Sequence, residues 1–358
     1  MKLNEALQCL VILGCHRSGT SMLAGILEAS GGKLPSGLMR PALTNRNGFN
    51  ESWLVVDINE SILKSCDIPW DYPEPTPRCI EKDSFAERFV PAVQTSLSEA
   101  FGSEDSLTGP MILKDPRMCR TFPIWEKTMT RIGLSPTVVI PVRNPFDVIR
   151  SLEIRDGMQP SHACFVWIWH IVEAVLWSNH LLPRFVLFEG LLEDPALCLK
   201  NALGFEIPSK AYEVVRPDLN HGSSSFDRYP QNVEPFRTAI ELYRKVSILH
   251  EPDAELLDEV RRLREFAIEQ SRYKERRYRR REKRLISDLS ALKKETSEKV
   301  RANITSFESC SSLPTISQRD IKSSDKIRRM QNSFSWKVTA PLRFLRRMLI
   351  DPVLKVLK

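Results

Sequence analysis

Apolar and polar positions along the first 205 residues predict short buried strands separated by helices. Four short apolar runs are predicted as strands, at residues 7–14, 110–114, 137–142 and 184–188. Helical spacing of apolar residues predicts helices at residues 20–29, 51–65, 84–101, 145–155, 162–182 and 191–203. Such alternation is typical of a parallel sheet with helices on both faces. The pattern therefore predicts a three-layer α/β fold whose ligands bind at the carboxyl ends of the strands.

The pattern weakens after residue 208, and the chain is expected to divide into five segments. Residues 1–215 form the predicted binding domain, and residues 216–253 either complete it or connect it to the next segment. Residues 254–300 are charged and helical, as a solvated helix or a coiled coil, and are a candidate contact for a homo-oligomer. Residues 301–332 are rich in Ser and Thr and are predicted as a flexible linker. Residues 333–358 form a basic amphipathic tail, so the fold is expected to carry a C-terminal basic helical extension.

The net charge of +7 hides an asymmetry between the two ends of the chain. Residues 1–260 hold 25 Lys and Arg against 34 Asp and Glu, whereas residues 261–358 hold 27 against 11. The basic character thus belongs to the C-terminal part, and we expect no nucleic-acid partner for the globular part. Charge alone leaves open whether the tail contacts anionic lipid, an acidic glycan or nucleic acid.

Cysteine usage and the apolar runs indicate a cytoplasmic chain. The eight cysteines form no C-x-x-C pair, which favours reduced thiols. The first apolar run leads directly into a glycine-containing loop, so a cleavable signal is not expected there. No apolar run approaches the roughly 18–20 residues of a membrane span.

The loop after the first predicted strand has the pattern of an anion-binding loop. Gly14 and Gly19 occupy the two glycine positions of G-x-x-x-x-G-K-[ST], a loop that surrounds a phosphate with backbone N–H groups at a helix N-terminus. Thr20 stands where nucleotide triphosphatases have the lysine that reaches the γ-phosphate, and Arg17 supplies a cation instead. The loop therefore predicts a P-loop-like fold that binds a nucleotide other than ATP or GTP.

Other segments, taken in order with this loop, resemble a known superfamily. They are Asn47-Gly48-Phe49-Asn50-Glu51, Lys114-Asp115-Pro116-Arg117, Val142-Arg143-Asn144-Pro145 followed by Ser151, and Phe188-Glu189-Gly190-Leu191-Leu192-Glu193-Asp194-Pro195. Together with His16-Arg17-Ser18-Gly19-Thr20-Ser21, they resemble the sulfotransferases that use 3′-phosphoadenosine 5′-phosphosulfate (PAPS), and most of all the bacterial branch with H-R-S-G-T-S. The resemblance covers roughly residues 8–205. Phe188 and Gly190 depart from the family pattern Y-E-D-L-x-x-D-P.

The resemblance implies a role for each part of the donor site. The loop His16–Ser21 would bind the 5′-phosphosulfate of PAPS, with Arg17, Gly19 and the hydroxyls of Ser18, Thr20 and Ser21 among its contacts. Arg143 and Ser151 would bind the 3′-phosphate, for which a planar guanidinium is a suitable donor. Without the resemblance, Arg143 would be read as a salt-bridge partner of Asp147.

The resemblance also implies the catalytic residues. Lys114 matches the lysine that stabilises charge in the transition state, and Arg17 could assist it. The alternative interpretation of Lys114 is a structural ion pair with Asp115 or another carboxylate. Glu51 matches the position of the glutamate that acts as the base in tyrosylprotein and heparan sulfotransferases. The alternative interpretation is a solvated acidic residue at the start of a helix. His16 and Asp115 are the competing bases, and no metal is expected.

Two other functions compete with sulfuryl transfer. A P-loop kinase of a small molecule is disfavoured by Thr20 and by the Arg143 and Ser151 pair. A non-catalytic scaffold with a basic tail is disfavoured because the expected site residues are present.

The tail also suggests an acceptor. Residues 333–343 read S-F-S-W-K-V-T-A-P-L-R and resemble the tails of bacterial envelope-polysaccharide glycosyltransferases. This resemblance implies a glycan or glycolipid acceptor, with peripheral contact at the inner membrane.

Overall fold

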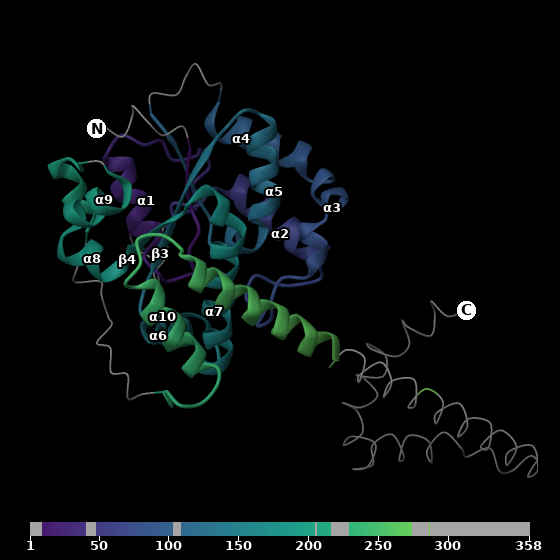
Figure 1. The fold of residues 1–358 in the computed structure, drawn as a ribbon. Coiled ribbons are helices and arrows are strands. Elements are labelled where there is room, and N and C mark those ends of the chain that lie inside the picture. Colours follow the sequence, from purple (N-terminus) through teal and green to yellow (C-terminus); the bar gives the residue numbers. More distant parts are fainter. Residues whose placement is uncertain are drawn as a thin grey trace, which may run out of the picture. The chain divides into compact units, whose positions relative to one another are not determined.

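The computed structural model describes residues 9–40, 48–102, 109–204, 206–215, 229–273 and 286. Its centre is a parallel sheet of four strands in the order β2-β1-β3-β4. The strands are β1 (Cys9–Ile12), β2 (Met111–Lys114), β3 (Pro136–Val142) and β4 (Arg184–Leu187). This arrangement confirms the predicted α/β fold with a parallel sheet and helices on both sides (Figure 1).

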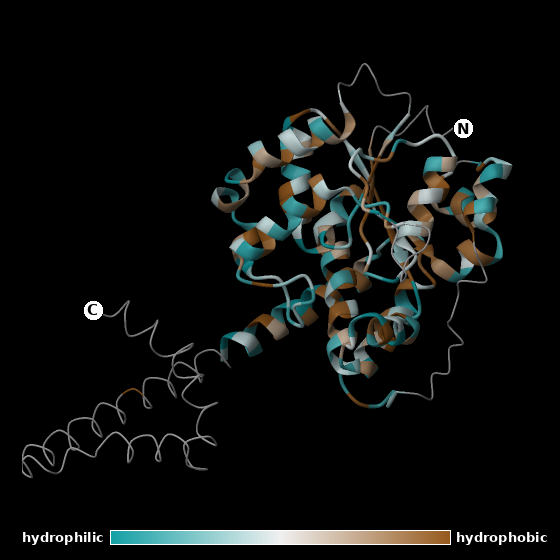
Figure 2. Cartoon of the chain, turned by 180° about the vertical axis from the view of Figure 1, so that it is seen from behind, coloured by the Kyte–Doolittle hydropathy of each residue, from teal (hydrophilic) through white to brown (hydrophobic). Residues whose placement is uncertain are grey.

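The two faces of the sheet bury alternate residues of the same strands. Leu10 and Ile12 of β1 pack with one set of helices, whereas Cys9 and Val11 pack with the other. All four side chains are fully buried, and the strands run through the molecule as a continuous apolar layer (Figure 2). Burial on both faces explains why the strands read as uninterrupted apolar runs in the sequence.

Helices from both halves of the sequence cover the sheet. One face carries α1 (Thr20–Ala29), α8 (Phe188–Glu193), α9 (Pro195–Leu203) and the 3₁₀ helix η5 (Ser209–Val214). The other face carries α2 (Trp53–Ser65), α4 (Val90–Phe101), α5 (Met118–Arg131) and α7 (Pro160–Ser178). The remaining named elements are η2 (Arg78–Glu81), α3 (Asp83–Glu87), α6 (Pro145–Asp156), η4 (Asn179–Leu181) and α10 (Phe236–Val246).

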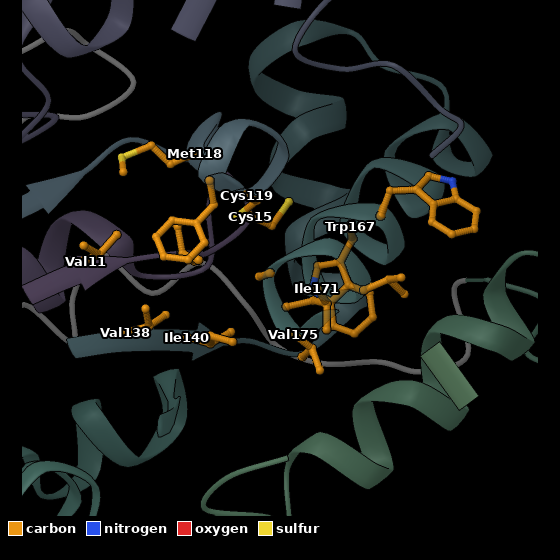
Figure 3. Close-up of a cluster of buried hydrophobic side chains, with 14 of the residues drawn as sticks. Val11, Cys15, Met118, Cys119, Val138, Ile140, Trp167, Ile171 and Val175 are labelled. Atoms are coloured by element: carbon orange, nitrogen blue, oxygen red, sulfur yellow. The ribbon is translucent and has the colours of Figure 1, made fainter. Parts of the chain in front are cut away.

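The core on the second face is built around α5 and α7. Met118 and Cys119 of α5 and Trp167 of α7 are fully buried beside Val11 and Ile140 of the sheet (Figure 3). Residues 254–273 are also helical, and this segment adds Leu256 and Val260 to the same core.

Two predicted helices are divided in the structure, and helix α5 lies where none was predicted. The predicted helix 191–203 spans the end of α8 and all of α9, with Asp194 between them. The predicted helix 84–101 is two helices, α3 and α4, because Pro91 lies in the first turn of α4 and starts a new helix there. Helix α5 was not predicted at all, since its buried positions include the polar residues Arg120, Thr121 and Thr128.

The helices are all too short or too polar to cross a bilayer, within the part of the chain that the structure describes.

Candidate active site

The expected donor-binding residues follow the two central strands of the sheet, and Lys114 ends the edge strand β2. From β1 the chain continues toward β2, and from β3 it continues toward β4, so these connections leave in opposite directions. Neighbouring strands with this relation form the topological switch point at which α/β sheets bind ligands. The loop at residues 13–19 follows β1, and Arg143 follows β3 directly. The topology therefore places both parts of the predicted donor site at this point.

The loop after β1 has the backbone shape that its glycines predict. Arg17 and Gly19 have φ angles of 68° and 82°, in the left-handed region. A Cβ atom on Gly14 would lie 2.7 Å from Cγ of Pro141, so only glycine allows this approach. Helix α1 begins directly after Gly19, which has no side chain with which to cap it. The N–H groups of its first turn are therefore available to an anion.

A cavity of about 680 Å³ brings the sequence-predicted residues together. Of the ten expected site residues, eight line it: His16, Arg17, Gly19, Thr20, Ser21, Glu51, Lys114 and Arg143. Ser18 is fully buried, and its hydroxyl has no hydrogen-bond partner among the described residues. Ser151 contacts the site through Arg17. Segments that are far apart in the sequence thus form one site.

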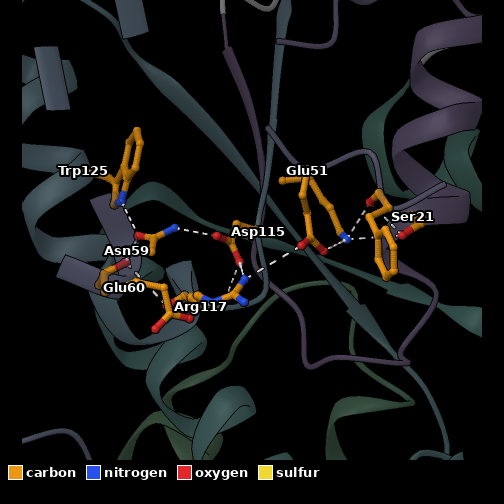
Figure 4. A network of polar contacts seen from close by, with 10 residues as sticks. Ser21, Glu51, Asn59, Glu60, Asp115, Arg117 and Trp125 are labelled. Carbon is orange, nitrogen blue, oxygen red and sulfur yellow. Dashed lines mark hydrogen bonds and ion pairs between the residues drawn. The ribbon is translucent and has the colours of Figure 1, made fainter. Parts of the chain in front are cut away.

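Lys114 and Glu51 form a buried ion pair at one side of the cavity. The Lys114 ammonium donates to Glu51 Oε1, to the Phe49 carbonyl at 2.9 Å and to Ser21 Oγ at 3.2 Å (Figure 4). Burial raises the pKa of Glu51, while Lys114 and Arg117 act in the opposite direction. The ion-pair alternative for Lys114 is thus present, with Glu51 as its partner. The pair nevertheless lies in the cavity, where a cation and a carboxylate can both meet a ligand.

Arg17, Arg143 and Ser151 form a contiguous group on the other side of the loop. Arg17 donates from Nε to Ser151 Oγ at 2.7 Å, and Arg143 donates from Nη1 to the Arg17 carbonyl at 3.1 Å. The Arg143 guanidinium lies 4.3 Å from the centre of the Phe188 ring. Burial lowers the pKa of both arginines, as expected for cations held out of water. The group presents two guanidinium groups to the cavity.

His16 lies beside the rings of Trp70 and His170. Its ring lies 4.3 Å from the Trp70 ring and 6.0 Å from the His170 ring, between centroids. Burial, followed by the charge of Arg155, lowers the pKa of His16 well below its ordinary value. The imidazole is therefore neutral near pH 7 and can shape the loop or accept a hydrogen bond.

Asp115 is held in contacts that leave little room for a role as a base. One carboxylate oxygen accepts from the Asn59 amide, and the other accepts from the backbone and the guanidinium of Arg117. Asp115 is fully buried. Its geometry suits the interpretation that it orients Arg117.

Sequence reasoning missed several residues of the site region. Asn59, Phe188 and Arg155 were assigned no role, yet Asn59 fixes Asp115, and the other two line the cavity. Asn59 carried a usable signal, because it is a polar residue at helical spacing from the buried Val55 and Ile62 of α2.

Comparisons with known proteins add little to this picture. No family model matches the chain, and no curated protein matches it either. Among solved structures, the chain is similar to the sulfotransferase domain from the Synechococcus PCC 7002 olefin synthase, with 16% sequence identity and a TM-score of 0.36. The match covers 72% of this chain and 93% of that chain. A likeness this weak says nothing about the chemistry of the site.

Proposed function

We propose that the chain is a sulfotransferase that moves the sulfuryl group of PAPS to a hydroxyl of a glycan or glycolipid. The observation that carries the proposal is the cavity that joins an anion-binding loop, the Lys114–Glu51 pair and Arg143. These are the groups that an anionic adenylate donor and a hydroxyl acceptor require.

The donor set suits PAPS, which carries phosphate at two positions of its ribose. The first turn of α1 suits the 5′-phosphosulfate, as does the buried Ser18 hydroxyl, which has no partner within the described ranges. Arg143 and Ser151 suit the 3′-phosphate. Arg17 joins these two residues, because its guanidinium donates to Ser151 and its carbonyl accepts from Arg143. Thr20 begins α1 where a triphosphatase would have its lysine, which supports a donor without a γ-phosphate.

The chemistry assigned to the site needs one fixed cation and one base. When bound, PAPS supplies an activated sulfuryl group whose departure leaves negative charge on the nucleotide. Lys114 provides a buried positive charge in the cavity, and such a group stabilises developing charge by a few kcal/mol. Glu51, with a pKa raised by burial, is suited to accept the proton of the attacking hydroxyl.

The proposal is tested first by donor binding and then by turnover. Calorimetry should show that 3′-phosphoadenosine 5′-phosphate (PAP), the desulfated product, binds and that ATP with Mg²⁺ does not. Radiolabelled sulfate should then pass from PAPS to one of a set of fractionated envelope glycans. Binding of ATP–Mg²⁺ without PAP binding would favour a small-molecule kinase, and PAP binding without transfer to any acceptor would favour a scaffold.

The acceptor and the place of action are inferred from the tail, which lies outside the described residues. We infer that residues 333–358 hold the enzyme at the cytoplasmic surface of the inner membrane, beside the synthesis of envelope polysaccharide. Deletion of residues 327–358 should release the enzyme from membranes and leave turnover on a soluble acceptor unchanged. Unchanged membrane association of the truncated chain would contradict this part of the proposal.

A further inference from the structure

A chain of polar contacts joins α2 and α5 and ends at Glu51. The Asn59 amide donates to Asp115 Oδ2 at 2.9 Å, and Arg117 donates from Nη1 to Asp115 Oδ1 at 3.0 Å. The same Nη1 lies 3.8 Å from Glu51 Oε2 (Figure 4). On its outer side, Arg117 donates from Nε to Glu60 Oε1 at 2.5 Å. Arg117 is thus held by two carboxylates in a position where its charge faces a third.

Glu51 therefore faces two cations, one at each carboxylate oxygen. Lys114 contacts Oε1 and Arg117 lies beside Oε2. The two cations differ in one respect, because Lys114 lines the cavity and Arg117 does not. A ligand in the cavity can compete for Lys114, whose other partners are Ser21 and the Phe49 carbonyl. Arg117 is held by Asp115 and Glu60, neither of which lines the cavity.

We propose that Arg117 is a positioning residue that keeps Glu51 ionised while Lys114 turns to the ligand, and that Asn59 and Asp115 fix it for this task. The proposal rests on the proposed function, in which Glu51 is the base of the reaction. A base that becomes protonated when its lysine leaves cannot accept a proton. A second cation outside the cavity removes that conflict.

The charges around Glu51 agree in sign with this role. Burial raises the pKa of Glu51, Lys114 lowers it, Asp115 raises it and Arg117 lowers it. Asp115 has a double effect, since its own charge opposes ionisation of Glu51 while its contacts hold Arg117 in place. Arg117 is therefore the residue to change, because its removal takes away one positive charge whose effect on the pKa of Glu51 has a known direction.

The first test is the pH dependence of sulfate transfer by Arg117→Gln. Loss of the cation should raise the pKa of Glu51 and move the acidic limb of kcat upward by about one pH unit. At pH values below the wild-type limb the rate should fall roughly tenfold, and it should recover to within about twofold above the shifted limb. Arg117→Lys should restore most of the original profile, because it keeps the charge.

Arg131→Gln is the matched control, since Arg131 ends the helix that Arg117 precedes, α5, but pairs with Glu87 at the surface. It should leave the limb where it is. A uniform loss of rate at every pH in Arg117→Gln, with no shift of the limb, would show that Arg117 only supports the fold and would overturn the proposal.

A second measurement does not need turnover and separates this proposal from the proposed function. Urea unfolding of the wild type, Arg117→Gln, Glu51→Gln and the double variant gives the coupling between the two side chains. We expect a coupling of about tenfold in the unfolding equilibrium constant at pH 8, and a smaller one at pH 5, because protonation of Glu51 weakens its attraction to Arg117. Equal stability losses at both pH values and no coupling would refute the proposal, even if sulfate transfer is observed.

Discussion

Gly19 allows both a left-handed backbone in the loop and the close approach of a neighbouring ring, which a residue with a side chain does not allow together. Its φ angle is 82°, and a Cβ atom there would lie 2.4 Å from Cδ2 of Phe188. The Phe188 ring in turn lies against the Arg143 guanidinium. Gly19 therefore allows the ring to approach the loop and hold Arg143 beside it.

Gly19→Ala should lose both stability and affinity for PAP. The left-handed backbone alone costs about 1 kcal/mol for alanine, and the contact with Phe188 should add about 1–3 kcal/mol. Gly133→Ala is the matched control, because Gly133 has a φ of 79° and a Cβ added there would meet no atom of the described residues within 4 Å. Chemical denaturation and calorimetry with PAP measure the two effects. Equal losses in the two variants would contradict a role for the Phe188 contact.

Lys114→Ala should lose sulfate transfer much more than donor binding. Removal of a fixed charge that acts on the transition state lowers kcat by about 10²–10³-fold. Binding of PAP, which lacks the sulfuryl group, should change by only a few-fold. Lys127→Ala controls for loss of a lysine, since Lys127 pairs with Asp83 and Glu87 at the surface of α5. A parallel loss of PAP affinity and of turnover would assign Lys114 to ground-state binding instead.

At the scale of single residues, the sequence identified those site residues that belong to short contiguous motifs. The loop residues 16–21 and Lys114 belong to short motifs next to strands, and the structure brings them into one site. Phe188 and Arg117 gained their contacts only through folding, from partners far away in the chain. No local pattern could have revealed those contacts.

At the scale of elements, helices α2 and α5 are joined through Asn59. Its carbonyl oxygen accepts from Thr121 Oγ1 at 2.6 Å and from Trp125 Nε1 at 2.7 Å, and its amide donates to Asp115. Asn59 and its three partners are fully buried, so these groups lie away from water. One side chain thus fixes the helix that follows Glu51 to the helix that follows Arg117.

Asn59→Ala should destabilise the protein by about 2–4 kcal/mol, because several buried polar groups lose their partner at once. Urea unfolding measures this loss. Asn201→Ala is the control, since Asn201 is an exposed residue of α9 and its loss should change stability by less than about 0.5 kcal/mol. A similarly small effect at Asn59 would mean that the contacts between α2 and α5 do not depend on it.

The strands could be predicted from the sequence and α5 could not, because burial is visible in a sequence only where the buried residues are apolar. A strand buried on both faces is apolar throughout, so its sequence shows its environment directly. Helix α5 buries Arg120 instead, whose guanidinium donates to the carbonyls of Tyr72 and Glu74. A buried charge that is satisfied by distant carbonyls looks like a surface residue in the sequence.

At the scale of the whole molecule, the first part of the charged C-terminal segment belongs to the core. Leu256, Val260 and Ile268 are buried, and Arg264 lies in the same stripe at spacings of four residues. The charged composition of residues 254–300 predicted a solvated helix or a coiled coil. In the structure Arg264 donates to the Thr76 carbonyl at 3.2 Å and to Glu81 at 2.6 Å.

Arg264 also neutralises a buried acid of α7. Its Nε lies 3.6 Å from Glu173 Oε1, and Arg120 lies 3.8 Å from the other oxygen. Glu173 further accepts from the backbone N–H and the hydroxyl of Thr76. Burial raises the pKa of Glu173, whereas Arg120 and Arg264 act against it. Helix 254–273 therefore supplies part of the charge that allows α7 to keep a carboxylate in the core.

Arg264→Met should destabilise the fold, and the loss should depend on pH. Removal of one partner of a buried pair costs about 3–5 kcal/mol, less here because Arg120 and Thr76 remain. The variant raises the folded-state pKa of Glu173 further above its unfolded value. A raised acid pKa favours the folded state while the group is protonated, so stability falls as pH rises toward the folded pKa.

The deficit of Arg264→Met relative to the wild type should therefore be smaller at pH 5 than at pH 8, as measured by urea unfolding at both values. Arg262→Met, on the exposed side of the same helix, should show little deficit at either pH. Glu173→Gln in the Arg264→Met background should remove the pH dependence, since no titrating acid is left there. A deficit that stays constant across pH would show that Arg264 contributes by packing on Trp177 and not by its charge.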